Sequence, residues 1–348
     1  MRVLVTGGAG YVGSVSVERL VAAGHDTIAL DSLVTGHRAA VVDGARLVHG
    51  TLRDQDAVEA LLRRERIEAV LHCAARSLVG QSVAEPALYY GENVIGGVGL
   101  LDAMLAAGVE RLVFSSTAAI YGTPESVPIP EDAPLAPINP YGETKRTFEG
   151  AMRWYGEAYG LRGVALRYFN VAGASERNGE QHDPETHLIP NVLAAALGRR
   201  NLEVFGTDYP TPDGTCIRDY IHVEDLADAH LAALELTARP AGVSGGSSGP
   251  GGTGGENTAP RRGGLTACNL GSGSGFSVLE VVRAAESVVG HAIPYEAGPR
   301  RPGDPPALVA SNARARELLG WTPRRGTLEE MIGSAWRWLE ARPDGYPE

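Results

Sequence analysis

Short strand-like segments alternate with longer helix-like segments over the first half of the chain. The first kind is rich in β-branched and aliphatic residues, and the second repeats apolar residues at helical spacing. This alternation predicts parallel strands joined by right-handed helical crossovers, since parallel neighbours cannot be joined by a tight hairpin. The expected strands are 2–6, 27–30, 46–48, 69–72, 111–115 and 163–167, and the expected helices are 11–23, 54–64, 86–107 and 141–158.

The fold class that follows is α/β, with a Rossmann-type, doubly wound parallel sheet. The 348 residues exceed what one simple core usually holds. We therefore expect a nucleotide-binding domain over 1–176 and a smaller C-terminal α/β domain over 177–348, which binds the substrate. Residues 242–264 are rich in Gly, Ser, Pro and Thr, and they predict a mobile insertion between a helix and a strand.

A glycine-rich loop follows the first strand directly. Gly7, Gly10 and Gly13 stand at the turn between that strand and the first helix, in the run TGGAGYVG. Glycines there permit a tight turn, close approach of the backbone to a pyrophosphate, and close helix–sheet packing. The free N–H groups at the start of the helix then face the phosphates. The loop predicts a dinucleotide site.

Asp31 closes the second strand. A carboxylate at this position accepts hydrogen bonds from the ribose hydroxyls and repels a 2′-phosphate. We therefore predict NAD and not NADP as the cofactor.

Tyr141 and Lys145 lie four positions apart, so a helix places them on one face. A nearby positive charge favours the phenolate and lowers the pKa of a tyrosine toward a useful range. Thr117 ends the strand before them, at the edge where open α/β sheets bind ligands. Together the three residues predict a centre that removes a proton from an alcohol while hydride leaves its carbon.

The composition excludes several classes of function. The formal net charge is −11, with no basic tract to neutralise phosphates, so we expect no nucleic-acid partner. No apolar run is long enough to span a bilayer, and the first residues lack the pattern of a signal peptide. The three cysteines are widely spaced, which predicts a cytoplasmic protein with no metal site and no disulfide framework.

The second half of the chain supplies groups that suit a nucleoside diphosphate. Amide and guanidinium donors stand beside flat side chains, and such groups bind phosphates and stack on bases. These residues lie in the segments 167–174, 187–190, 204–223 and 300–304.

Two levels of resemblance emerge from these motifs. The glycine spacing and the set Thr117, Tyr141 and Lys145 resemble the extended short-chain dehydrogenase/reductase superfamily. The run FGTDYPTPDGTCIRDYIHVEDLA over 205–227 is similar to the UDP-glucose (UDP-galactose) 4-epimerase family, and the likeness covers nearly the whole chain outside 242–264. The resemblance implies an NAD-dependent isomerase of galactose and nucleotide-sugar metabolism, and a homodimer.

The resemblance also implies the roles of individual residues. Catalysis would fall to Tyr141, Lys145 and Thr117, through a 4-keto sugar formed by reversible hydride transfer from C4. The NAD site would be lined by Gly7, Gly10, Tyr11, Val12, Gly13, Asp31, Cys73, Ala74, Ala75, Tyr141, Lys145 and Phe169. The UDP-hexose would be held by Thr117, Tyr141, Asn170, Leu188, Val204, Phe205, Arg218, Arg301, Asp304 and Leu308.

Further functions stay open at the level of the sequence. A nucleotide-sugar 4,6-dehydratase is disfavoured, because Ala118 and Ala119 follow Thr117 where an acidic pair is usual. Within the family, a 4-epimerase of UDP-GlcNAc or UDP-glucuronate is the alternative, since Leu308 is smaller than the tyrosine often found at that position. The motifs are also compatible with a net dehydrogenase and with a non-catalytic nucleotide-sugar sensor.

Overall fold

The centre of the molecule is a parallel sheet of seven strands, seen in a computed structural model that describes residues 1–239, 263–301 and 304–347. All of its paired strands run in the same direction. From one edge to the other the strands are β11 (Gly264–Leu270), β6 (Arg162–Tyr168), β5 (Arg111–Thr117), β4 (Ala69–His72), β1 (Arg2–Thr6), β2 (Asp26–Asp31) and β3 (Ala45–His49). The order reverses between β1 and β4, as in a Rossmann sheet, so the predicted fold class is confirmed.

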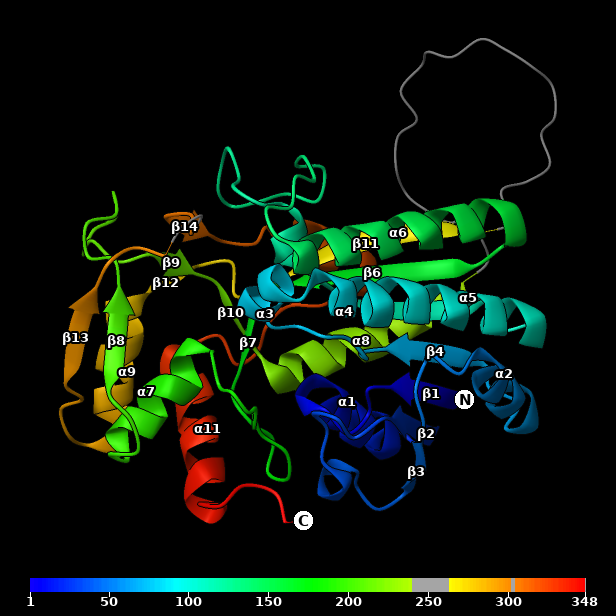
Figure 1. Cartoon of the computed structure of the whole chain (residues 1–348), viewed down its shortest axis with the longest axis horizontal. Helices are drawn as coiled ribbons and strands as arrows, with labels where there is room; N and C mark the ends of the chain where they lie inside the picture. The colour runs from blue at the N-terminus through cyan, green and yellow to red at the C-terminus, as the bar shows by residue number, and fades with distance from the viewer. Residues whose placement is uncertain (240–262, 302–303, 348) are drawn as a thin grey trace, which may run out of the picture.

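Helices cover both faces of this sheet (Figure 1). One face carries α1 (Tyr11–Ala22), α8 (Val223–Ala238) and α10 (Ala313–Leu319). The other face carries α2 (Gln55–Arg64), α5 (Gly96–Ala107) and α6 (Pro140–Tyr159), with α3 (Val79–Ala84) and α4 (Pro86–Tyr89) beside α6. Short 3-10 turns follow β2 and β5, as η1 (Arg38–Ala40) and η3 (Ala118–Ile120).

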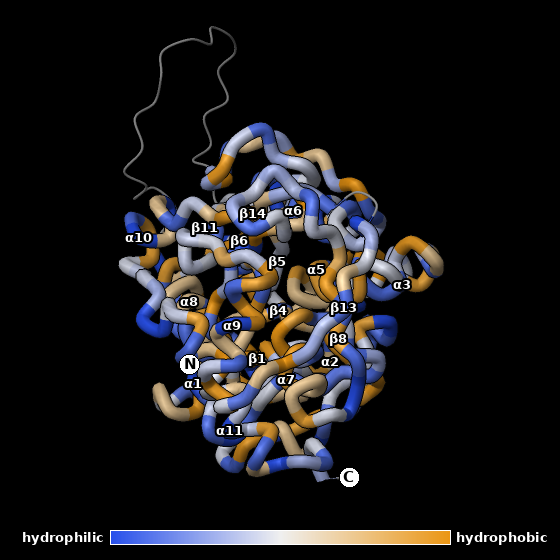
Figure 2. The backbone as a smooth tube through the Cα atoms, turned by 90° about the vertical axis from the view of Figure 1, so that its left-hand side faces the viewer, coloured by the Kyte–Doolittle hydropathy of each residue, from blue (hydrophilic) through white to orange (hydrophobic). Residues whose placement is uncertain are grey.

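The alternation of side chains along the strands explains why two helical layers are needed. Val3 and Val5 of β1 belong to the core beneath α1 and α8, whereas Leu4 belongs to the core beneath α2 and α5. Successive side chains of a strand point to opposite faces, so a strand that is apolar throughout must be covered on both sides. The apolar parts of the chain accordingly gather inside the molecule (Figure 2).

The later part of the chain forms a separate part of the molecule beside the sheet, with a third apolar core of its own (Figure 1). Its helices are α7 (Leu188–Ala196), α9 (Val278–Val289) and α11 (Leu328–Ala341). Its strands form small sheets, namely β8 (Leu202–Phe205) with β13 (Tyr295–Gly298), β7 (Asn170–Ala172) with β10 (Tyr220–His222), and β12 (Phe276–Ser277) with β9 (Ile217–Arg218) and β14 (Ala307–Leu308).

The chain passes more than once between the seven-stranded sheet and this separate part. Strand β11 and helices α8 and α10 come from beyond residue 177, yet they pack on the seven-stranded sheet. The boundary between residues 176 and 177 therefore stays a prediction. Most of the predicted insertion, 242–262, lies outside the described residues, while Gly264 begins β11.

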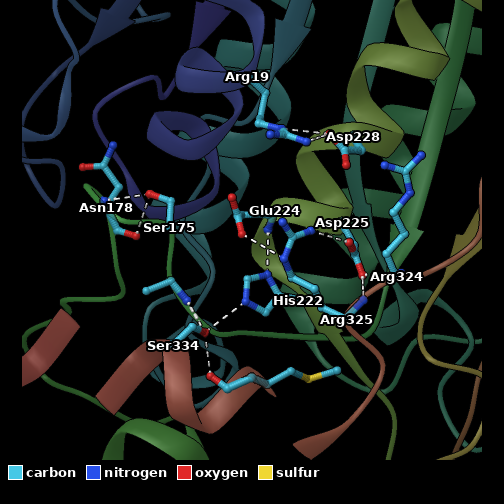
Figure 3. A network of polar contacts seen from close by, with 12 residues as sticks. Arg19, Ser175, Asn178, His222, Glu224, Asp225, Asp228, Arg324, Arg325 and Ser334 are labelled. Atoms are coloured by element: carbon cyan, nitrogen blue, oxygen red, sulfur yellow. Dashed lines mark hydrogen bonds and ion pairs between the residues drawn. The ribbon is translucent and has the colours of Figure 1, made fainter. Parts of the chain in front are cut away.

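A polar network joins α8 to both parts of the molecule (Figure 3). Arg19 of α1 donates from Nε to Asp228 at 2.8 Å. At the start of α8, the Nε2 atom of His222 lies 2.9 Å from Ser334 Oγ on α11. Arg325 forms ion pairs with the acidic first turn of α8. These contacts join α8 to α1 on the sheet and to α11 in the separate part of the molecule.

The expected helix over 86–107 is broken into three parts. A π-helical segment, η2 (Tyr90–Ile95), stands between α4 and α5. Within it the buried Asn93 donates from Nδ2 to the Arg76 carbonyl at 3.0 Å and to Thr144 Oγ1 at 3.1 Å. The wider turn of the π-helix thus places the Asn93 side chain between the loop after β4 and helix α6. Such π-bulges often occur at functional sites. Across the described part of the chain, no helix has the length and apolarity that crossing a bilayer requires.

We expect Gly13→Ala to destabilise the protein, because an added Cβ would lie 1.9 Å from the Gly7 carbonyl oxygen. The cost should be about 1–3 kcal/mol, as for other overpacked sites. Gly150→Ala is the matched control, since a Cβ there would meet nothing within 4 Å. Replacing a glycine inside a helix by alanine should raise the free energy of unfolding by about 0.5–1 kcal/mol. In thermal unfolding, the midpoint of Gly13→Ala should lie below that of wild type and the midpoint of Gly150→Ala at or above it. Equal midpoints for the two variants would contradict the prediction.

Candidate active site

The glycine loop forms a cradle that side chains would fill. Gly7 has a φ of +70°, and a Cβ on it would lie 2.6 Å from the Ala74 nitrogen. Gly10 is the N-cap residue of α1 and offers no side chain to the free N–H groups of Tyr11 and Val12. The backbone can therefore approach a ligand closely, and the helix presents unpaired donors to it. Both properties fit a pyrophosphate.

Asp31 lies at the carboxyl end of β2, beside this loop. Its carboxylate accepts hydrogen bonds from the backbone N–H of Ala9 at 2.9 Å and of Leu33 at 2.8 Å. These bonds orient the side chain and leave further lone pairs on the two oxygens. An acceptor fixed beside the phosphate cradle suits a ribose with free hydroxyls, so the residues present fit NAD.

The loop after β4 closes the other side of the cradle. The Cys73 N–H donates to the Thr6 carbonyl at 2.9 Å, which holds Cys73, Ala74 and Ala75 against the glycine loop. The neighbouring His72 is a satisfied core histidine, because its Nδ1 lies 2.7 Å from Thr6 Oγ1 and its ring stacks on Phe114.

Helix α6 brings Tyr141 and Lys145 to the end of β5. Asn139 caps the helix by accepting from the Gly142 N–H at 2.8 Å, and Pro140 stands at the first helical position. A Cβ on Gly142 would lie only 2.5 Å from the Ala119 carbonyl oxygen. This glycine therefore permits the contact between α6 and η3 that places Tyr141 beside Thr117. Sequence reasoning missed its role, although it stands next to the tyrosine.

Lys145 is buried, with 3% of its surface exposed. Its ammonium donates to the Ser115 carbonyl at 2.8 Å and lies 4.7 Å from the centre of the Phe114 ring. Burial lowers its pKa to about 8, against the opposing effects of Cys73 and Glu149. The group is still mostly charged at neutral pH, and it lies 5.8 Å from the centre of the Tyr141 ring.

Burial has the opposite effect on the phenol of Tyr141. It raises the pKa to about 12, while a hydrogen bond with the Thr117 side chain pulls the pKa down. The expectation that Lys145 keeps this pKa low is therefore not met by the protein groups alone. The cost of burying a phenolate is the largest effect here, because the ring packs edge-on to Tyr89 in an apolar setting.

A buried ion pair supports this end of the site. Arg167 of β6 and Glu149 of α6 pair at 2.6 Å, with both side chains almost fully enclosed. Glu149 also accepts from Ser116 Oγ at 2.6 Å, and Arg167 donates to Tyr121 Oη at 2.9 Å. Each charge is thus hydrogen-bonded as well as paired, as buried charges require. The network fixes α6 against the strand that carries Thr117.

The residues predicted to hold the UDP moiety fall into two groups, of which the first is polar. Arg218 of β9 forms an ion pair with Asp304. In the register of the small sheet, Leu308 of β14 stands opposite Arg218. Asp304 is joined to Arg301 by a backbone hydrogen bond of 3.2 Å. The structure therefore brings these four predicted residues together.

The second group is flat and apolar. The Arg301 guanidinium lies 4.1 Å from the centre of the Phe205 ring. Leu188, at the start of α7, packs against a cluster that contains Val204 and Tyr209. Val204 is 1% exposed, so its side chain supports this surface from within. Phe205 and Leu188 are half-buried.

Asn170 and Phe169 connect the sheet to this second part of the molecule. Asn170 donates from Nδ2 to the Asp219 carbonyl at 2.9 Å. Phe169 is buried in a cluster with Ala118 and Ile129, next to η3. Both predicted residues thus lie between the end of β5 and the strands that carry Arg218.

Asp219 was missed by sequence reasoning. Its carboxylate is fully buried and accepts four hydrogen bonds, from the backbone of Ser272, Gly273 and Ala310 and from Ser272 Oγ. Its own N–H donates to the Leu308 carbonyl at 2.9 Å. The residue therefore fixes the backbone that carries Arg218. Its place in the run IRDYIH, beside the arginine, is the only signal that could have suggested it.

Comparison with known proteins agrees with this architecture. The model of the NAD dependent epimerase/dehydratase family matches residues 3–243. A UDP-glucose 4-epimerase of Lactobacillus helveticus is 48% identical over 351 residues, which cover 100% of this chain and 100% of the relative. The UDP-glucose 4-epimerase of Streptomyces lividans is 50% identical over 347 residues, which cover 99% of this chain and 98% of the relative.

Solved structures show the same likeness. The crystal structure of UDP-glucose 4-epimerase from Brucella ovis in complex with NAD is 43% identical, with a TM-score of 0.88 and coverage of 97% of each chain. The enzyme from Bifidobacterium longum in complex with NAD⁺ and UDP is 35% identical, with a TM-score of 0.88 and coverage of 99% of this chain and 100% of the other. The chain belongs to the NAD dependent epimerase/dehydratase family, and its relatives there include the UDP-glucose 4-epimerases.

Proposed function

We propose that this protein is an NAD-dependent UDP-glucose 4-epimerase, which interconverts UDP-glucose and UDP-galactose. One observation carries the proposal: Thr117, Tyr141 and Lys145 meet at the carboxyl end of β5, which contacts the loop after β4 through Ser115 and Cys73 and the start of β7 through Ala118 and Phe169. A proton-transfer centre thus lies between groups that suit two different nucleotides. The full-length likeness to UDP-glucose 4-epimerases supports this substrate over other UDP-sugars.

NAD is the proposed cofactor, bound by the cradle of Gly7, Gly10 and Gly13, by Asp31 and by the loop after β4. When bound, it would supply reversible hydride transfer at C4 of the sugar and, in its oxidised form, a positive charge that favours the phenolate. Phe169 completes the lining on the side of η3.

The chain's own part in the reaction is to move one proton at the sugar 4-oxygen. Tyr141 takes the proton from the 4-hydroxyl and later returns it to the same oxygen. Thr117 hydrogen-bonds that oxygen and can relay the proton. Lys145 stabilises the phenolate through its charge. The Ser115 carbonyl holds its ammonium, so this charge does not move during turnover.

The UDP groups must stay fixed while the sugar turns. Arg218 and Asn170 are proposed to hold the diphosphate, with Arg301 beside them, and Asp304 to accept from the uridine ribose. Leu188 and Phe205 are proposed to enclose the uracil, with Val204 behind them, and Leu308 to border the sugar. Rotation of the keto sugar about its bond to UDP then presents the other face of C4, which inverts that centre when hydrogen returns.

Turnover of Tyr141→Phe should fall by about 10²–10⁴-fold, because the proton acceptor is lost while the ring still packs. Tyr159→Phe is the matched control, since Tyr159 is exposed on the same helix. Products from UDP-galactose, with no NAD added, would be separated and counted for both variants. Unchanged turnover in Tyr141→Phe would contradict the role of Tyr141, and absence of product with wild type as well would favour a non-catalytic sensor.

Lys145→Met should abolish most activity yet make the folded protein more stable near neutral pH. The lysine pKa of about 8 is below its ordinary value of 10.5, so the unfolded chain binds the extra proton more readily between these values. Keeping the charge in the folded state therefore costs about 3 kcal/mol below pH 8, reduced by about 1 for the lost hydrogen bond.

Thermal unfolding across pH tests this sign. The midpoint advantage of Lys145→Met should be full at neutral pH and should shrink as the pH rises from about 8 through 10.5, above which the lysine is neutral in both states. Lys145→Arg is the comparison that keeps a buried charge. A Met variant that is less stable than wild type at neutral pH would contradict the claim that the buried charge of Lys145 opposes folding.

We also propose a cytoplasmic homodimer formed through the α5 and α6 face of the sheet. Apolar side chains on this side of the molecule are exposed, among them Ile95, Leu105 and Trp154. An exposed apolar patch of this kind marks an association surface. The free thiols of Cys73, Cys216 and Cys268 suit a reducing compartment, which cell fractionation would check.

Light scattering of the purified protein tests the dimer. Wild type should have twice the monomer mass, and Ile95→Glu should shift toward the monomer because it would bury an unpaired charge at the interface. Leu197→Glu is the control, an exposed leucine at the end of α7 in the other part of the molecule. A monomeric wild type would rule the interface out.

A further inference from the structure

Four metal-binding types of side chain meet in the segment between β7 and α7. They are Glu180, His182, Glu185 and His187, in the pattern E-x-H-x-x-E-x-H. One ligand atom from each residue lies within 4.8 Å of the other three. None of them belongs to the groups assigned above to catalysis or to the nucleotides. We propose that they bind one divalent transition-metal ion of the zinc class.

The spacing of the ligand atoms suits a tetrahedral ion. His187 Nδ1 lies 2.9 Å from Glu180 Oε1 and 2.8 Å from Glu185 Oε1. His182 Nδ1 lies 3.2 Å from Glu180 Oε1 and 3.6 Å from Glu185 Oε2. Zinc bonds to nitrogen and oxygen are about 2.0–2.1 Å long, which places tetrahedral ligands about 3.3–3.4 Å apart. Glu185 takes part through both of its oxygens, so small movements suffice to bring one ligand atom from each residue around an ion.

The two carboxylates are held and largely shielded from water, and the His182 and His187 side chains are 23% and 40% exposed. The Glu180 and Glu185 side chains are 8% and 17% exposed. Glu185 Oε1 accepts from the backbone N–H of Thr186 and of His187, both at 2.7 Å, so its carboxylate is oriented by its own turn. The buried His182 Nδ1 has contacts with carboxylates but no hydrogen bond of good geometry. This nitrogen, aimed at two carboxylates, is free to coordinate an ion without breaking a hydrogen bond.

Two imidazoles and two carboxylates form a ligand set that zinc prefers, and hard cations such as Mg²⁺ prefer all-oxygen sites. The expectation of no metal site rested on the wide spacing of the cysteines, whereas this cluster consists of histidines and glutamates. Without an ion, protonated histidines would pair with the two carboxylates through the four contacts given above, and this is the competing explanation.

A bound ion would have a structural consequence for both nucleotide sites. His187 immediately precedes Leu188, which stands on the proposed uracil side. On the other side, burial raises the pKa of Tyr11 in the glycine loop, and the charges of Glu180 and Glu185 raise it further. The cluster therefore lies near the proposed NAD site. The ion would fix the segment that separates the two.

Metal binding to the full-length protein tests the proposal directly. The protein would be dialysed against EDTA, then titrated with ZnCl₂ by calorimetry and with CoCl₂ while visible absorption is recorded. We expect one ion per chain and the intense visible bands of four-coordinate cobalt. Absence of binding, or a cobalt spectrum typical of six oxygen ligands, would overturn the site.

Variants separate this site from adventitious binding. His182→Gln and, separately, Glu180→Gln should weaken zinc binding by at least about 100-fold, since loss of even an outer-shell partner costs 10–100-fold. His291→Gln, an exposed histidine elsewhere, should bind as wild type does. Far-ultraviolet circular dichroism of each variant would confirm that it is folded. Zinc affinity that is equal in wild type and both cluster variants would overturn the proposal in favour of plain ion pairs.

Discussion

The close contact between the start of α6 and the turn after β5 is the constraint on which the active site depends. Gly142 has no Cβ, so the helix backbone can reach the Ala119 carbonyl, where any side chain would collide at 2.5 Å. Asn139 fixes where the helix begins, which sets the rotation of Tyr141 and Lys145 about its axis. One cap and one missing methyl group thus decide whether phenol, hydroxyl and ammonium share a site.

This contact brings charges into the interior, and the fold must offset their cost. Lys145 has only a carbonyl and an aromatic face as near partners, so its burial opposes folding. The Glu149–Arg167 pair is better satisfied, with Ser116 and Tyr121 completing its hydrogen bonds. Two apolar cores on the faces of the sheet supply the stability that compensates. The site is therefore a place where function is kept at the expense of stability.

The sequence was a good guide wherever one local signal decided the structure. β1 and β4 begin and end where their apolar runs do, and the glycine loop joins β1 to α1 as its spacing predicts. Signals were weaker where distant segments decide. Nothing local shows that β11 extends the sheet beside β6, or that the π-helical segment around Asn93 serves Arg76 and Thr144. The rise in the Tyr141 pKa likewise comes from packing, which spacing does not reveal.

Asp219 explains how one half of the site can be rigid while the sugar moves. Its buried carboxylate accepts from the backbone of two separate segments, at Ser272–Gly273 and at Ala310, and its main chain bonds Asn170 and Leu308. A fully satisfied carboxylate of this kind locks the segments that it touches. Arg218 is the preceding residue in the chain, so the proposed diphosphate contacts rest on a fixed frame. Leu308 shares that frame and, as the proposed border of the sugar, would offer it only an apolar surface. Such a surface has no directional bonds to break, and it would allow a keto sugar to turn while its diphosphate stays in place.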